Sequence, residues 1–354
     1  MAILDKVFKA AVDLKASDIH VLPGEPFMVR RLGKMIRLKS QPLTDASCRK
    51  VIMEILTPEQ QRVLRDEMQL DFAYSIAGLG RFRGSAMLHN NGMSCIFRVI
   101  PDKIPSFKEL GIPEDVMHRI LENHQGIILV TGATGHGKTT TLAAMIDYVN
   151  SRHSHHILTV EDPIEFIHPL KKGAVNQRQL GRDTLAYANA LKGALRQDPD
   201  VIVIGELRDL DTISLAISAS ETGHLVIGTL STSSAPKTVD RIIDSYPAGE
   251  QNQVRAMLSE SLKAVFTQRL LPGADGTAMH LAVEIMIGNL SIANLIKDNK
   301  TFQIRSIMQM GKTTGMKLMD DSILELLQAG KISYQTAFAN IDKKEMLKPF
   351  APKA

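Results

Sequence analysis

The sequence GATGHGKT at residues 132–139 restricts the possible folds of this chain more than any other feature. It satisfies the pattern G-x-x-x-x-G-K-[ST], and it lies between an apolar run at 126–131 that predicts a strand and a helical pattern at 138–150. The glycines let consecutive backbone amides point inward, and the start of the helix adds a partial positive charge. The segment therefore predicts a phosphate-binding loop.

Two side chains of this loop predict its ligand. Lys138 would reach the β- and γ-phosphates of a nucleoside triphosphate, and the Thr139 hydroxyl would bind Mg²⁺. His136 occupies a position where only the backbone amide is needed. The predicted nucleotide-binding residues are Gly132, Ala133, Thr134, Gly135, His136, Gly137, Lys138, Thr139 and Thr140.

Short apolar segments alternate with helical patterns from about residue 114 to 288. Apolar runs this continuous are typical of strands buried on both faces, and the alternation predicts an α/β domain with a parallel sheet covered by helices. The segments are 126–132, 156–161, 200–206, 224–230 and 281–287.

The rest of the 354-residue chain is predicted to form two further parts. Residues 1–100 combine helical patterns with hairpin-forming strands and predict a small α+β domain. Residues 101–113 contain three prolines, which cannot lie inside one regular element, and predict a linker. Residues 289–354 predict a helical C-terminal subdomain.

Composition narrows the class of protein. No apolar run approaches the roughly 20 residues that cross a bilayer. The two cysteines, Cys48 and Cys95, have neither metal-ligand spacing nor a disulfide pattern, which favours a reducing compartment. The net charge is +4 without a long basic run, and the absence of Trp leaves few platforms for stacking nucleic-acid bases.

Hydrolysis requires a carboxylate near the phosphate loop, and the sequence offers two groups of acids at strand ends. Glu206 follows the apolar segment at 200–205, where an acid beside the phosphate-loop strand would lie. Glu161, Asp162 and Glu165 follow the segment at 156–160. The pattern does not say which acid is the base.

A second cationic feature lies in the first domain. Residues 81–89 alternate, with Arg81 and Arg83 on the face opposite the apolar residues. If Asn91-Gly92 is the hairpin turn, Arg98 lies opposite Ser85 and diagonal to Arg83. Like charges on one face repel one another unless an anion lies among them, so this face is a candidate phosphate site.

Several segments together resemble the secretion ATPases that power type II secretion and type IV pili. They are GATGHGKTTTLAAMIDY, TVEDPIEFIH, LRQDPDVIVIGELRD and ASETGHLVIGTLSTSSAPKTVDRIIDSYP, matching the Walker A, Asp box, Walker B and His box of that family. ASDIHV, GRFRGSAML, MLSESLKAVFTQRLLP and the tail TGMKLMDDSILELLQAGKISYQTAFA also resemble it, so the similarity covers about residues 5–345. The start of ASDIHV after one predicted helix, and the stretch SIANLIKD, favour the pilus retraction (twitching motility) subgroup of the PilT and PilU type.

The resemblance implies roles for individual residues. It makes Glu165 the general base, Glu206 the Walker B acid that supports Mg²⁺ and water, and His224 the first His-box histidine. It also implies that Arg83 and Arg98 meet nucleotide phosphates. The remaining candidates, which flank Walker B and could act across a subunit boundary, are Arg196 and Arg208.

The sequence departs from the family pattern at two positions. Ser231 stands where the second His-box histidine is common, and Ala293 stands where an arginine is usual. A hydroxyl can neither carry a positive charge nor span the distance of an imidazole, so altered nucleotide sensing is expected.

The resemblance further implies a RecA-like P-loop domain preceded by a small PAS-like α+β domain, with ATP and Mg²⁺ as cofactors. ATP would close a cleft between these domains, and the linker would act as the hinge. The expected partners are five further copies in a homo-hexamer, an inner-membrane pilus platform protein and a paralogous retraction ATPase, at the cytoplasmic face of the inner membrane; no nucleic acid is expected.

Two alternative functions remain open from the sequence. An accessory nucleotide-binding ring with weak ATPase activity, supporting a paralogous pilus motor, is favoured by Ser231. A RecA-like nucleic-acid translocase shares the P-loop core, but its basic, aromatic channel loop is not found in the sequence.

Overall fold

The computed structural model describes residues 3–100 and 103–351. The chain divides into two compact units. Unit 1 consists of Met1–Lys103 together with the short segment Pro163–Ile167, and unit 2 consists of Ile104–Asp162 and His168–Ala354. The four-part division predicted from the sequence stays a prediction, and residues 101 and 102 of its linker lie outside the described residues.

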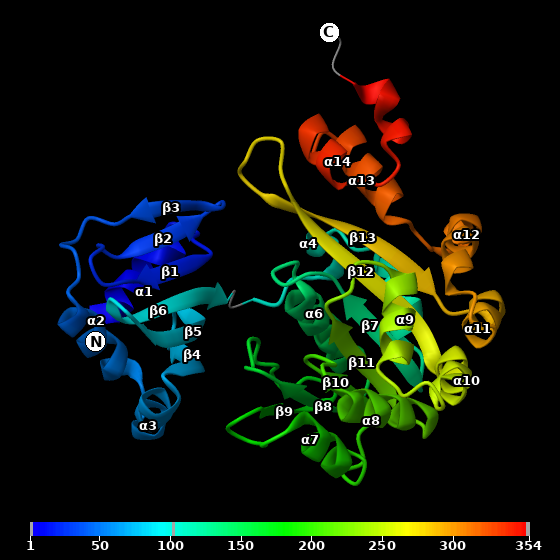
Figure 1. Ribbon diagram of the computed structural model, residues 1–354, viewed down its shortest axis with the longest axis horizontal. Helices are drawn as coiled ribbons and strands as arrows, with labels where there is room; N and C mark the ends of the chain where they lie inside the picture. Colours follow the sequence, from blue (N-terminus) through cyan, green and yellow to red (C-terminus); the bar gives the residue numbers. More distant parts are fainter. Residues whose placement is uncertain (1–2, 101–102, 352–354) are drawn as a thin grey trace. The chain divides into compact units, whose positions relative to one another are not determined.

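Unit 1 is a six-stranded antiparallel sheet with three helices (Figure 1). The strands lie in the order β3-β2-β1-β6-β5-β4. Its helices are α1 (Ile3–Asp13), α2 (Asp45–Ile55) and α3 (Pro58–Glu67), and its strands are β1 (Asp18–Val21), β2 (Met28–Arg31), β3 (Lys34–Arg37), β4 (Gln69–Ile76), β5 (Gly80–His89) and β6 (Gly92–Ile100).

One face of this sheet packs on the helices. Phe8 of α1 stacks on Phe82 of β5 at 4.2 Å between ring centroids and meets Phe97 of β6 edge-on at 4.9 Å. Cys48 and Ile52 of α2 are fully buried in the same cluster. Because side chains alternate along a strand, burial of Phe82 and Phe97 turns Arg83 and Arg98 to the other face.

The turn between β5 and β6 differs from the sequence prediction. His89 pairs with Gly92, so the turn residues are Asn90 and Asn91 rather than Asn91 and Gly92. Gly92 is the first residue of β6, and a β-carbon there would collide with Asp45. The carboxylate of Asp45 accepts the Met93 amide at 2.8 Å.

This turn moves the register by two residues. Arg98 lies directly opposite Arg83, and Ser85 lies opposite Ile96, so the predicted Arg98–Ser85 pairing was wrong. The two guanidinium groups therefore share one row of the sheet.

Unit 2 is built on a seven-stranded sheet in the order β13-β12-β7-β11-β10-β8-β9. The strands are β7 (Gly126–Thr131), β8 (His156–Glu161), β9 (Ala174–Gln179), β10 (Val201–Ile204), β11 (Leu225–Leu230), β12 (Leu262–Pro272) and β13 (Met279–Ile287). All neighbours are parallel except β12 and β13. The fold is thus the α/β class predicted from the sequence.

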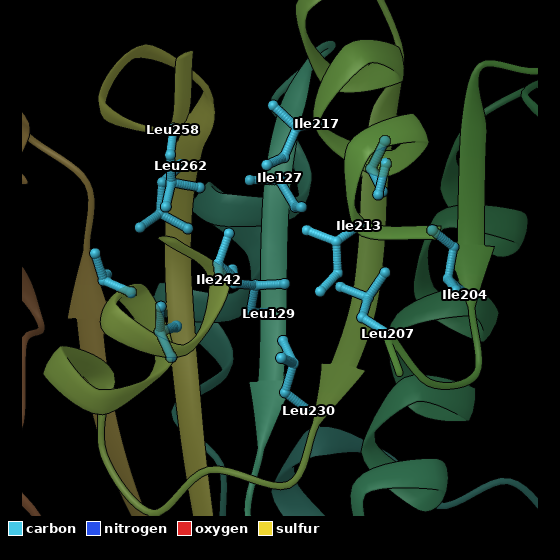
Figure 2. Packing of buried hydrophobic residues seen from close by; sticks show 14 of the residues in the cluster. Ile127, Leu129, Ile204, Leu207, Ile213, Ile217, Leu230, Ile242, Leu258 and Leu262 are labelled. Atoms are coloured by element: carbon cyan, nitrogen blue, oxygen red, sulfur yellow. The ribbon is translucent and has the colours of Figure 1, made fainter. Parts of the chain in front are cut away.

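Helices cover both faces of this sheet. One face carries α4 (Phe107–Leu110), α5 (Glu114–Leu121) and α6 (Lys138–Arg152). The other carries α7 (Tyr187–Ala194), α8 (Leu210–Glu221), α9 (Ala235–Asp244), α10 (Gln251–Ser261), α11 (Leu290–Lys297) and α12 (Ile304–Met310). Figure 2 shows Ile127 and Leu129 of β7 among the residues of the second face. Ile128 and Val130 face the first, which explains the unbroken apolar run.

Two strands were not predicted, and one was predicted in the wrong direction. β9 is polar, and β12 contains Thr267, Gln268 and Arg269, so neither has a continuous apolar run. The segment at 281–287 runs antiparallel because the short loop 273–278 joins β13 to β12 as a hairpin, whereas a parallel strand needs a long crossover.

The C-terminal region of unit 2 is helical beyond β13, as predicted for the described residues. It contains α11, α12, α13 (Met319–Gln328), α14 (Tyr334–Asn340) and the 3₁₀ helices η1 (Thr301–Gln303), η2 (Gly311–Thr314) and η3 (Lys344–Phe350). In the described parts of the chain, no helix has both the length and the apolarity to cross a membrane.

Candidate nucleotide site

The predicted phosphate loop connects the carboxyl end of β7, the third strand in the sheet order, to α6. Gly132, Gly135 and Gly137 have φ values of 142°, 82° and 81°, which side chains with a β-carbon rarely adopt. Gly137 is also the residue before the first turn of α6, so the free amides of the helix begin at the loop. The strand, loop and helix predicted at 126–150 are confirmed.

Lys138 lies at the start of α6 with its ammonium folded over the loop. Nζ donates to the carbonyls of Gly132 at 2.8 Å and Ala133 at 3.2 Å. Burial lowers the pKa of this ammonium, and the negative charge of Glu206 opposes the change.

Glu206 follows β10 at the same edge of the sheet as the loop. The sequence predicted that Glu206 would lie beside β7, the strand that precedes the loop. In the structure, β11 lies between β7 and β10, so Glu206 is one strand further away. Its carboxylate instead meets the end of β11, where Ser231 Oγ donates to Oε1 at 3.3 Å. Arg208 Nε binds the other oxygen at 2.6 Å, and Arg208 Nη1 lies 3.6 Å from Asp162.

The acids after β8 separate into different surroundings. Glu161 is buried in unit 2 and accepts hydrogen bonds from Thr159 at 2.6 Å and Gln177 at 3.0 Å. Glu165 belongs to the segment that groups with unit 1, where its carboxylate lies 3.6 Å from Arg83 Nη1. Burial raises the pKa of Glu165, while Arg83 and Arg98 act in the opposite direction.

The arginines of unit 1 form part of a charged row across three strands. Arg98 lies between Asp18 of β1 and Arg83 of β5 in the sheet register. Its Nε is 3.2 Å from Asp18, whereas Arg83 reaches Asp71 at 3.4 Å and Glu165 at 3.6 Å. Asp18 and Asp71 were not predicted, because pairing across strands leaves no local sequence signal.

Two predicted residues lie away from the phosphate loop. His224 directly precedes Leu225, the first residue of β11. Leu225 pairs with Gly126, the first residue of β7, so His224 lies at the edge of the sheet where the parallel strands begin. Six residues of strand, or about 20 Å, separate this edge from the loop. There His224 Nδ1 bonds the Ala219 carbonyl at 3.1 Å, which is a structural contact. Arg196 is exposed near the same edge, before β10.

Tyr187 is a buried site residue that sequence reasoning missed. Its hydroxyl lies 3.2 Å from the position of a β-carbon on Gly205, the residue before Glu206. Burial raises its pKa, and the charges of Asp162 and Glu206 act in the same direction, so the phenol stays protonated. The residue is on α7, which ends just before the segment LRQDPDVIVIGELRD, and it belongs to none of the recognised motifs.

The chain is similar to proteins of type IV pili. The chain is 46% identical over 322 residues to the "type IV pilus retractation ATPase PilT" of Pseudomonas aeruginosa, which covers 91% of this chain and 93% of that protein. It is 34% identical over 344 residues to the "type IV pilus ATPase PilU" of the same organism, covering 97% and 90%.

A crystal structure of the pilus retraction motor PilT with bound ADP superposes with a TM-score of 0.87 at 41% identity, covering 99% of both chains. In addition, residues 1–340 match the family described as type II/IV secretion system protein. With this match and these identities, the chain belongs to the type II/IV secretion system protein family.

Proposed function

We propose that this chain is a Mg²⁺-dependent ATPase motor that drives retraction of a type IV pilus. The observation that supports this most directly is the carboxyl edge of the unit 2 sheet. There the loop at 132–139 follows β7 and Glu206 follows β10, so parallel strands bring Lys138 and the carboxylate to the same edge. The similarity to PilT over nearly the whole of both chains supports the motor function.

The residues of the loop fit a nucleotide. The backbone at Gly132, Gly135 and Gly137 adopts the positive φ angles that turn amides into the loop, and Gly135 has no atom within 4 Å of a β-carbon position. Thr139 and Glu206 would hold Mg²⁺ together with the phosphates, as is usual for this ion. When bound, the ion would neutralise charge on the phosphate oxygens.

Glu165 is our candidate for the general base. A carboxylate is a better proton acceptor when its pKa lies closer to the working pH, and burial moves the pKa of Glu165 in that direction. Arg83 and Arg98 are our candidates for phosphate binding, since a planar guanidinium binds phosphate oxygens in pairs and stays charged. Arg208 is retained as a trans candidate, although it pairs with Glu206 and Asp162 in its own chain.

The proposed assembly is a homo-hexamer at the cytoplasmic face of the inner membrane. An inner-membrane platform protein and a paralogous retraction ATPase are the proposed partners. The higher identity to PilT than to PilU favours the main retraction motor over its paralogue.

One observation supports an accessory ring with weak ATPase activity as a second candidate. Ser231 places a neutral hydroxyl 3.3 Å from Glu206, at the end of β11. A hydroxyl satisfies one carboxylate oxygen but supplies no charge to a phosphate, so turnover could be slow while nucleotide still binds.

ATP turnover of the purified chain, measured as phosphate release with Mg²⁺, tests both candidates. The matched control is Lys138→Ala, which removes the loop ammonium. A motor shows turnover well above this control. Turnover at the level of the control, with ADP binding retained in calorimetry, selects the accessory ring, and absence of both contradicts the proposal. Ser231→His then measures what the second histidine would add.

A further inference from the structure

β12 supports the phosphate loop from behind. It lies beside β7 in the sheet, and Thr267 pairs with Thr131, the last residue of β7. The two hydroxyls are 2.9 Å apart and buried. The next residue of β12, Gln268, therefore lies level with the beginning of the loop.

The backbone carbonyl of Gln268 contacts the loop at two points. A β-carbon on Gly132 would lie 2.5 Å from this oxygen, so the strand and the loop approach as closely as a glycine permits. The same carbonyl lies 3.2 Å from Nδ1 of His136. Because a carbonyl only accepts, Nδ1 carries the proton and donates. The imidazole of His136 thus points toward β12 and connects this part of the loop to the strand by a hydrogen bond.

The side chain of Gln268 binds the helix that follows the loop. Nε2 donates to Thr141 Oγ1 on α6 at 2.6 Å. The residue is 2% exposed, and Oε1 has no hydrogen-bond partner among the described residues. A buried amide with one unpaired oxygen is less favourable for stability than an apolar side chain of the same size. Stability alone therefore does not account for this residue.

The opposite face of β12 packs on the C-terminal helices. Arg269 Nη1 donates to the Asn340 carbonyl at the end of α14 at 2.6 Å. Leu271 is buried in one cluster with Met319 and Ile323 of α13. Successive side chains of a strand point to opposite faces. Gln268 therefore contacts the loop and α6 on one face, while Arg269 and Leu271 contact the C-terminal helices on the other.

We infer that Gln268 is a positioning residue for the phosphate loop, and that β12 transmits nucleotide binding to α13 and α14. This inference rests on the proposed function, because it requires the loop to bind nucleotide. The physical basis is the set of contacts from one residue to the loop at Gly132 and His136 and to α6 at Thr141. A shift of the loop on binding would move β12, and with it the strand's contacts with the C-terminal helices.

Gln268→Met in the full chain tests the inference, because methionine keeps the length but cannot donate to Thr141. Gln251→Met is the matched control. Gln251 lies on α10, away from the loop, and its Nε2 donates to the Tyr246 carbonyl at 3.2 Å. ADP affinity is measured by calorimetry with Mg²⁺. Amide hydrogen exchange of α13 and α14 is measured with and without ADP.

We expect Gln268→Met to bind ADP about three- to tenfold more weakly than the parent. ADP should slow exchange in α13 and α14 of the parent and of Gln251→Met, and this effect should be lost at saturating ADP in Gln268→Met. Equal affinity and equal protection in all three proteins would overturn the inference while leaving the proposed function intact. Failure of the parent to bind ADP would overturn both.

Thr141→Val provides a second route if Gln268→Met does not fold, as judged by circular dichroism. It removes the same hydrogen bond from the partner side with little change in volume. The same loss of affinity and of protection supports the inference, and parental behaviour contradicts it.

Discussion

The two sheets of this protein present functional groups in different ways. In unit 2, the candidate groups follow the carboxyl ends of β7, β10 and β11, so the direction of parallel strands brings them to one edge. In unit 1, Arg83 and Arg98 lie in the middle of antiparallel strands, and the register alone makes them neighbours. A site at strand ends tolerates uncertainty in register, whereas a site on a sheet face does not.

This difference explains where the sequence reasoning succeeded. The strand, loop and helix at 126–150 were located correctly because the backbone requirements of the loop are met by consecutive residues. The pairing of the arginines was wrong because one turn residue decides it. Four changes test this contrast, from the largest expected effect to the smallest.

Glu206→Gln tests the strand-end site of unit 2. It keeps the shape but removes the negative charge beside Ser231 and Arg208. We expect kcat for ATP to fall about 100-fold, equivalent to ~3 kcal/mol, since charge placed for the transition state is lost. Steady-state phosphate release measures this, with the exposed Glu250→Gln as control. A loss of less than threefold would remove Glu206 from the site.

Gly92→Ala tests the register of unit 1. A β-carbon there combines a φ of 118° with a collision against Asp45, and we expect a loss of about 2–3 kcal/mol in unfolding free energy. Gly24→Ala is the matched control, because Gly24 has a φ of 86° but open space around it. Hydrogen exchange of unit 1 peptides in native conditions measures both. Equal losses would show that backbone strain, and not the collision with Asp45, accounts for the cost of a side chain at residue 92.

Arg98→Ala tests the cationic row on the unit 1 sheet. We expect ADP to bind about tenfold more weakly, as for loss of one charge-assisted contact to phosphate. Arg30→Ala is the control, because Arg30 also lies opposite Asp18 but on the far strand β2. Calorimetry at fixed ionic strength compares the two. A similar decrease in both variants would indicate a general charge effect instead of a site.

Arg83→Ala is expected to change the pH profile of turnover. Burial raises the pKa of Glu165 and Arg83 opposes this, so removing Arg83 raises that pKa further. A base acts only when ionised, so turnover is lost as the pH falls through its pKa, and the acidic limb should move to higher pH. Measurement of kcat from pH 5 to 8 tests this, and an unchanged limb would argue against Glu165 as the base.

The same shift has a consequence for stability. The pKa of Glu165 is higher in the folded protein than in the unfolded chain, so the folded protein binds the proton of this carboxyl group more tightly than the unfolded chain does. The contribution to unfolding free energy is complete below the unfolded pKa and is lost as the pH rises through the folded pKa. Unfolding midpoints of the parent and of Glu165→Gln should therefore converge at low pH.

The sequence by itself determined the local features of this protein. The glycines at 132–137 and the apolar run before them predicted the strand, the loop and the helix, because backbone conformation there depends on adjacent residues. The alternation in β5 likewise predicted that Arg83 and Phe82 face opposite sides.

Only the tertiary structure decided which distant residues meet. Asp45 lies against Gly92 from 47 residues earlier in the chain, and β11 separates Glu206 from β7. Glu165 groups with unit 1 although it follows a strand of unit 2. In strand β12, the polar residues Thr267, Gln268 and Arg269 interrupt the apolar run, so the sequence did not place Gln268 beside the loop. Such contacts arise because packing and register are properties of side chains brought together by the whole fold, and no segment of sequence contains both partners.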